Sequence, residues 1–117
     1  MADRRERTDG SRKKVFRWFV SLMEERAWLE EMSLQGWFLA DLHLGIWYVF
    51  EKGEPRRTAY DVERFDLEKN PTRREIQEKS EFMDMASETG WRLVCRDEGM
   101  NYYLAKAWED DETNELY

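Results

Sequence analysis

The sequence predicts an α+β fold: two tandem strand–helix–strand–strand units whose strands form antiparallel sheet, with two helices packed on one side. Three observations lead to this prediction. The spacing of apolar residues changes twice from the helical period to the period of two that is typical of strands. A Gly-Trp pair follows each expected helix, at Gly36-Trp37 and at Gly90-Trp91. The chain has 117 residues, of which 15% are aromatic, and this suits one small domain with a modest core.

The first unit is expected over residues 13–54. Val15–Val20 is dense in β-branched and aromatic residues and therefore predicts a strand. Ser21, with Glu24 three residues later, predicts a helix that starts with a capping box. Gly36 ends this helix, because glycine tolerates the left-handed conformation found there. Beyond it we expect a hairpin, with strands at residues 37–42 and 46–51 joined by a turn at Leu44-Gly45.

The second unit is expected over residues 55–108. It begins with an alternating strand at residues 58–65, followed by a polar connection. Thr72 and Glu75 form a second capping-box pattern, which starts a helix that runs to about residue 89. Two further strands are predicted at residues 91–96 and 100–107.

A constant separation along the chain supports the repeat. Five pairs of like residues are each 54 positions apart: Gly36 and Gly90, Trp37 and Trp91, Leu39 and Leu93, Gly45 and Gly99, Tyr48 and Tyr102. All of them fall at matching places in the two expected hairpins, so we interpret the halves as copies of one unit. The connection between strand and helix is longer in the second copy.

The repeat also predicts which side chains face the helices. Trp91, Leu93 and Cys95 should share the inner face, since alternate residues of a strand point the same way. In the first unit the outer face is unusually apolar: Phe38, Ala40, Leu42 and Leu44. Either the other unit covers this face, or the face is a binding surface.

Charge is distributed unevenly along the chain. The net charge is −7, yet the first fourteen residues hold six basic and three acidic side chains. We expect residues 1–12 to be a disordered basic arm, able to touch a phosphate or an anionic lipid surface, and residues 109–117 to be an acidic tail or linker. The acidic body argues against nucleic-acid binding by the folded part.

Cysteine content and hydropathy narrow the class of protein further. A single cysteine, Cys95, excludes an internal disulfide. No stretch is long and apolar enough for a signal peptide or a membrane span, so we expect a cytoplasmic domain.

Few residues suit catalysis or metal binding. The single histidine, His43, and Cys95 do not form a ligand set, and no phosphate loop or dinucleotide motif is present. No cofactor and no metal is therefore expected. We interpret His43 as a turn residue and Cys95 as a small apolar residue. Asp61 and Glu63 share a strand face, where they are either solvated or hold a cation.

Strand aromatics are the strongest functional signal. Aromatic faces attract cations, and neighbouring carboxylates reinforce that attraction. The same rings could instead form the core or stabilise cross-strand pairs. The candidate residues for binding a ligand or partner are Phe38, Leu42, Trp47, Tyr48, Tyr60, Tyr102 and Tyr103.

Several short motifs, taken in order, resemble a known family: Trp28–Met32, Gln35-Gly36-Trp37, Tyr48–Gly53, Tyr60-Asp61-Val62, Gly90-Trp91 and Asn101-Tyr102-Tyr103. The pattern is similar to that of the bacterial family catalogued as domain of unknown function 2812, over about Val15 to Tyr117. The resemblance implies no assigned activity. It implies membrane-spanning helices after this domain in many members, and frequent association with PadR-type regulators.

At the level of fold, the paired units are similar to GyrI-like ligand-binding domains. In those domains an aromatic cleft between the halves can hold an apolar cation, but fold alone does not fix function.

The resulting functional expectation is a non-enzymatic sensing or protein-interaction domain, the cytoplasmic head of a membrane-associated regulatory protein. Its partner would be a protein or an apolar small molecule. One alternative is a domain that binds a lipophilic cation in an aromatic cleft. Another is a small enzyme that uses carboxylates in that cleft, with Asp61 and Glu63 as candidates.

Overall fold

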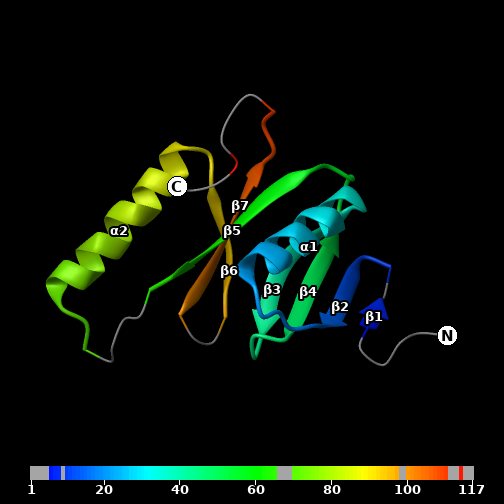
Figure 1. The fold of residues 1–117 in the computed structure, drawn as a ribbon, viewed down its shortest axis with the longest axis horizontal. Coiled ribbons are helices and arrows are strands. Elements are labelled where there is room, and N and C mark those ends of the chain that lie inside the picture. Colours follow the sequence, from blue (N-terminus) through cyan, green and yellow to red (C-terminus); the bar gives the residue numbers. More distant parts are fainter. Residues whose placement is uncertain (1–5, 9, 66–69, 98–99, 111–113, 115–117) are drawn as a thin grey trace.

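The computed structural model describes residues 6–8, 10–65, 70–97, 100–110 and 114. Seven strands and two helices follow one another in these ranges (Figure 1): β1 Glu6–Thr8, β2 Arg12–Phe16, α1 Leu22–Leu34, β3 Trp37–His43, β4 Trp47–Lys52, β5 Thr58–Arg64, α2 Arg73–Glu88, β6 Arg92–Arg96 and β7 Asn101–Ala107. The predicted α+β class is confirmed.

The strands form two antiparallel sheets. The first sheet has the order β1-β2-β4-β3, and the second sheet has the order β5-β7-β6. β1 apart, each sheet places the third strand of its unit between the first and the second. β3 and β6, the edge strands of the two sheets, lie beside each other without pairing.

The two hairpins also share their register. Each has a β-bulge in its first strand, and both bulges and cross-strand partners correspond at a separation of 54 residues: Leu39/Asp41 with Leu93/Cys95, Leu42↔Tyr48 with Arg96↔Tyr102, and Asp41↔Val49 with Cys95↔Tyr103. A bulge inserts one extra residue on one strand and so shifts the alternation of faces beyond it. The equivalences support the interpretation of two copies; the duplication itself stays a prediction.

The bulges change which side chains face inward. Leu42, predicted on the outer face, is only 1% exposed and belongs to the core beneath α1. The bulge at Ala40 shifts the alternation of the residues that follow it, so Leu42 faces the same side as Leu39. Cys95, predicted on the inner face with Trp91, packs instead against the α1 core, on the other side of its sheet. Both predictions of which face the side chain occupies were therefore wrong, because strict alternation along a strand takes no account of a bulge.

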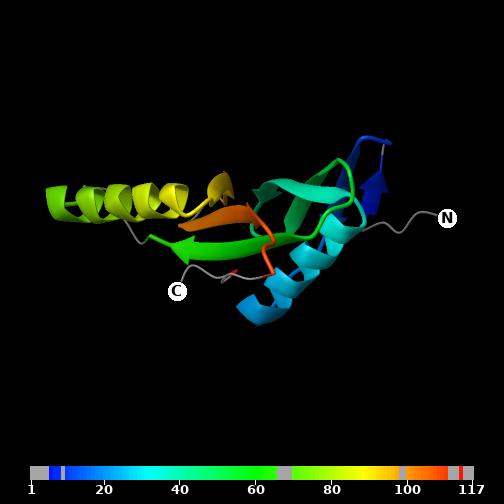
Figure 2. The same cartoon turned by 90° about the horizontal axis from the view of Figure 1, so that it is seen from above.

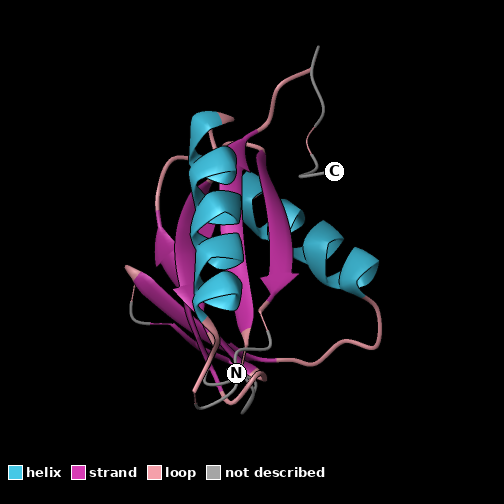
Figure 3. Cartoon of the chain, turned by 90° about the vertical axis from the view of Figure 1, so that its left-hand side faces the viewer, coloured by secondary structure: helices cyan, strands magenta, loops and turns pink. Residues whose placement is uncertain are grey.

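The helices do not share one side of the sheets, which differs from the prediction. α1 packs on the first sheet and also on one face of the second sheet, through Tyr60, Tyr103 and Ala105. α2 packs on the opposite face of the second sheet, where Tyr102 and Leu104 contact it. Figure 2 shows α2 above and α1 below β5 and β7, and Figure 3 shows the same separation from the side. The second half thus covers α1, so α1 has protein on both sides.

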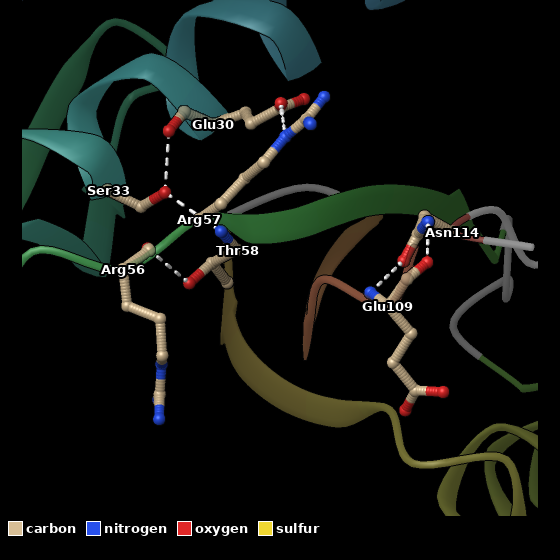
Figure 4. Close-up of polar contacts among 7 residues, drawn as sticks. All are labelled: Glu30, Ser33, Arg56, Arg57, Thr58, Glu109 and Asn114. Carbon is tan, nitrogen blue, oxygen red and sulfur yellow. Dashed lines mark hydrogen bonds and ion pairs between the residues drawn. The ribbon is translucent and has the colours of Figure 1, made fainter. Parts of the chain in front are cut away.

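α1 also closes the free edge of β5 (Figure 4). The Ser33 hydroxyl accepts a hydrogen bond from the Thr58 N–H at 3.0 Å, and the Arg26 Nε donates to the Tyr60 carbonyl at 2.9 Å. Ser33 and Thr58 are both buried, so these partners satisfy backbone groups that water cannot reach. Arg57 and Glu30 add an ion pair across the same boundary. These contacts protect the first residues of this edge from pairing with another chain.

The N-terminal part of the chain differs from the expected arrangement. Glu6–Thr8, expected in a disordered arm, forms β1 and pairs with β2. β2 ends at Phe16 rather than Val20, because its partner β4 begins at Trp47 and offers no further residues. Arg12, also expected in the arm, begins β2. Residues 1–5 and 9 of the arm and most of the acidic tail lie outside the described residues.

The two capping predictions had different outcomes. The Thr72 capping box is present, with Glu75 bonded back to the Thr72 backbone. Ser21 caps α1 by accepting from the Met23 N–H, without the predicted Glu24 arm of the box.

The two Gly-Trp glycines provide a stability test. Both have positive φ, 87° at Gly36 and 92° at Gly90, so alanine at either position costs about 1 kcal/mol in backbone conformation. A Cβ at Gly36 would lie 2.7 Å from the Gly53 carbonyl oxygen, whereas at Gly90 it would meet only the Lys106 side chain, at 3.6 Å. We expect Gly36→Ala to lower the free energy of unfolding by at least about 1 kcal/mol more than Gly90→Ala. Urea unfolding measures both, and equal losses would contradict the argument.

Candidate functional site

A buried carboxylate lies where the two halves meet. Glu25 is on the same stripe of α1 as Leu29 and Met32, four and seven residues further on, and is 5% exposed. A charge at a core position costs several kcal/mol unless it is hydrogen-bonded. The Glu25 carboxylate therefore requires hydrogen-bond donors around it.

Two tyrosines supply those partners. The Tyr48 hydroxyl, from β4, and the Tyr103 hydroxyl, from β7, both donate to Glu25 Oε2, the latter at 2.7 Å. Burial raises the pKa of both tyrosines far above the usual value, and the neighbouring Glu25 charge raises them further. Both hydroxyls thus stay protonated and act as donors. The carboxylate bridges one tyrosine from each sheet.

The second carboxylate oxygen is available. Both tyrosines use Oε2, and Glu25 Oε1 accepts no hydrogen bond from any residue in the described ranges. No side-chain oxygen or nitrogen in these ranges is both fully buried and unpartnered, so Oε1 keeps access to solvent or ligand.

A pocket of about 230 Å³ opens beside this carboxylate. Glu25, Tyr48 and Tyr103 line it together with rings and apolar groups from the connection between β2 and α1: Trp18, Phe19 and Leu22. The pocket therefore combines apolar walls with negative charge. Residues of both halves contribute to it.

Asp97 adds a second carboxylate to the pocket. It is 8% exposed and accepts hydrogen bonds from the backbone N–H of Asn101 at 3.3 Å and from its side-chain amide at 2.8 Å. These two bonds to Asn101 hold the Asp97 carboxylate in place at the wall of the pocket.

The rings beside the pocket already hold a cation. The Arg17 guanidinium lies 5.0 Å from the Phe19 ring centroid and 4.9 Å from that of Trp28, and Trp28 packs edge-on against Tyr48. These distances suit cation–π attraction. The aromatic cluster that contacts Glu25 is therefore electrostatically suited to positive charge.

The seven candidate residues predicted from the sequence lie at different places in the structure. It brings Tyr48 and Tyr103 together at Glu25. Tyr60 lies in the α1 core, where its hydroxyl accepts from the Leu39 N–H at 3.2 Å, and Leu42 lies in the same core. These two residues form scaffold around the pocket rather than its lining.

Phe38 and Trp47 point to the face of the first sheet away from α1, because each neighbours a residue of the α1 core. Trp47 packs against Phe16 at 5.2 Å, and the Lys14 ammonium lies 5.2 Å from its ring centroid. This face is distinct from the pocket.

Tyr102 lies on the α2 side of the second sheet. Its hydroxyl accepts hydrogen bonds from Lys79 at 2.7 Å and from Arg96 at 3.5 Å. Burial by itself raises the pKa of Tyr102, but these two cations outweigh it and lower the pKa. The pKa of Tyr102 is thus lowered, whereas the pKa of Tyr48, at the equivalent position of the other hairpin, is raised.

Asp61 and Glu63, the carboxylates considered from the sequence as solvated or as holding a cation, do not line the pocket. Asp61 accepts from the Val62 N–H and lies 4.0 Å from Arg26, and Glu63 pairs with Tyr102 across the strands. Sequence reasoning missed Glu25, although one signal was available: an acidic residue at the helical spacing of the buried stripe. Asp97 carried no such signal.

A larger hollow of about 560 Å³ lies between α1 and β5, lined by Arg26, Glu30, Tyr60 and Trp108. Its charged groups already pair within the protein. Arg26 bonds to Tyr60, Glu30 pairs with Arg57, and Arg57 stacks on Trp108 at 3.5 Å. We therefore place the candidate site at Glu25.

Other site types find no support in the described ranges. No three His, Cys, Asp or Glu side chains gather there closely enough to hold a metal ion. Burial raises the pKa of the Cys95 thiol to about 12, which disfavours the nucleophilic thiolate. None of the helices in the described part could cross a membrane.

The tyrosine pair predicts an alkaline loss of stability. Tyrosine ionises near pH 10 in the unfolded chain, whereas the folded pKa values of Tyr48 and Tyr103 are raised. Their contribution is complete below about pH 10 and declines above it, because only the unfolded state then releases protons. We expect the free energy of unfolding to fall above about pH 10, and to fall less steeply in Tyr48→Phe and Tyr103→Phe.

Tyr102→Phe is the matched control, since the pKa of Tyr102 is lowered and its removal should not flatten the profile. Urea midpoints between neutral and alkaline pH measure the slopes. Identical slopes for all three variants would contradict the assignment.

Comparison with known proteins identifies a family but no activity. No curated protein and no solved structure matches the chain at a significant level. The sequence profile of the family described as "Protein of unknown function (DUF2812)" matches residues 21–117. This range includes both helices, both hairpins, Glu25 and the two tyrosines that bond to it. The chain therefore belongs to the DUF2812 family.

Proposed function

We propose that this domain is a non-enzymatic ligand-binding domain that takes a small apolar cation in the pocket beside Glu25. The observation that carries the proposal is the buried Glu25 carboxylate, whose Oε1 accepts no hydrogen bond from the described residues and which borders an aromatic-walled pocket. Such a carboxylate gains most from a ligand that brings positive charge.

The volume of the pocket limits the ligand. Sites for drug-sized molecules span about 300–1,000 Å³, and this pocket has about 230 Å³. A compact cationic group, such as a quaternary ammonium, therefore fits beside Glu25. The remainder of the ligand would lie over Trp18 and Leu22, which are exposed at the pocket.

The position of Glu25 supports a sensing role. A cation beside the carboxylate competes with the hydroxyls of Tyr48 and Tyr103 for its negative charge, and these hydroxyls come from different sheets. Occupation of the pocket would therefore change how the two halves pack. A change of this kind can be transmitted to a protein partner.

Two parts of the functional expectation rest on the resemblance alone. These are a PadR-type partner and a place in a membrane-associated regulatory system. We place the enzymatic alternative second, because neither Asp61 nor Glu63 is among the residues that line the pocket. The protonated tyrosines are donors rather than bases.

Titration with benzyltrimethylammonium, followed by tryptophan fluorescence and calorimetry, tests the proposal. Glu25→Gln keeps an oxygen for the two hydroxyls but removes the charge, so affinity should fall about tenfold or more. Glu24→Gln is the matched control, since Glu24 is exposed on the same helical turn. It should bind like the unaltered chain.

Neopentylbenzene, in which carbon replaces the charged nitrogen, separates charge from shape. It should bind at least about tenfold more weakly than the cation. Equal affinity for the two compounds, or equal losses in Glu25→Gln and Glu24→Gln, would overturn the proposal.

A further inference from the structure

Exposed apolar side chains gather at one end of the first sheet. Five of them, called here the apolar tip, are each more than half exposed: Trp18, Val20, Leu22, Met23 and Leu44. Val20 reaches 91% exposure. Clusters of this kind on a small domain indicate an interaction surface, whereas isolated exposed apolar residues do not.

The apolar tip is one surface. Trp18 and Leu22 line the same pocket as Gly45, which follows Leu44 in the turn between β3 and β4. The Arg17 N–H donates to the Ile46 carbonyl at 2.8 Å and holds the connection between β2 and α1 against that turn. Figure 1 shows both segments at the same end of β3 and β4.

The segment that leads into the apolar tip is basic, whereas the carboxylates of the pocket beside the tip, Glu25 and Asp97, are buried in its wall. Residues 12–23 include four cations, Arg12, Lys13, Lys14 and Arg17, and no carboxylate, although the whole chain carries −7. Strands rise about 3.3 Å per residue, so Lys14 and Arg17 lie closest to the tip. The remainder of the molecule is correspondingly acidic.

We propose that the apolar tip docks on the surface of an anionic lipid bilayer. Apolar residues with a tryptophan suit the boundary between headgroups and acyl chains, and basic residues just behind them suit anionic headgroups. The acidic body would be repelled, which orients the domain with the tip toward the membrane. This proposal does not rest on ligand binding at Glu25.

Charge complementarity favours lipid over the alternative of a second copy of the chain. Two copies facing each other through this tip would bring their basic segments together, and like charges there would repel. An anionic bilayer instead offers opposite charge and an apolar interior at the same place.

Cosedimentation of the full chain with lipid vesicles tests the proposal. We expect binding to vesicles in which about a third of the lipid is phosphatidylserine, and at least about tenfold weaker binding to pure phosphatidylcholine. Val20→Asp should reduce binding to the anionic vesicles at least about tenfold, since it places a charge in the inserted tip. Val20 does not line the pocket and is nearly fully exposed, so the fold should tolerate the change.

Ile76→Asp is the matched control, because Ile76 is 52% exposed on α2, away from the tip. Ile76→Asp should bind anionic vesicles as the unaltered chain does. Added salt should weaken the binding of Ile76→Asp and of the unaltered chain alike. The proposal is wrong if anionic vesicles bind no better than neutral ones, or if the two variants lose binding equally. It is also wrong if gel filtration shows a dimer that Val20→Asp dissociates, which would assign the tip to a second copy.

Discussion

The halves of this domain are connected by the Glu25 carboxylate, which accepts hydrogen bonds from the hydroxyls of Tyr48 and Tyr103. Burial of this carboxylate costs several kcal/mol, and each hydrogen bond to a charged group offsets about 1.5–3 kcal/mol of that. Neither Tyr48 nor Tyr103 alone satisfies the group, so the arrangement requires both sheets to be in place around α1. A polar contact at the border of an otherwise apolar core thus joins the two halves.

The placement of α1 explains why this contact is possible. α1 packs on its own sheet and on the face of the second sheet that lies opposite α2. It also satisfies the edge of β5 through Ser33 and Arg26. As a result, one helix contributes core packing, edge protection and the carboxylate of the candidate site. α2 makes fewer such contributions, with only Ala86 fully buried.

The surroundings of two tyrosines at equivalent positions of the hairpins differ between the halves. The Tyr48 hydroxyl bonds to Glu25. Tyr102, at the equivalent position 54 residues later, bonds instead to Lys79 and Arg96. The same residue type at the same register therefore has opposite pKa shifts, because its neighbours come from different helices. Asymmetry between the halves, more than either half alone, produces the pocket.

Local patterns in the sequence predicted both helices, the strands from β2 to β7 and their order along the chain, but not β1. Apolar period, helix caps and glycines with positive φ act over a few residues and can be recognised without a fold. Only the tertiary structure decided the faces beyond each bulge, the opposite placement of the helices and the meeting of Glu25 with Tyr48 and Tyr103. Tyr48 and Tyr103 are 55 residues apart, and which surfaces two sheets bury against a shared helix depends on packing across the whole chain. For that reason the aromatic candidates could be predicted as a set, but the carboxylate that joins two of them could not.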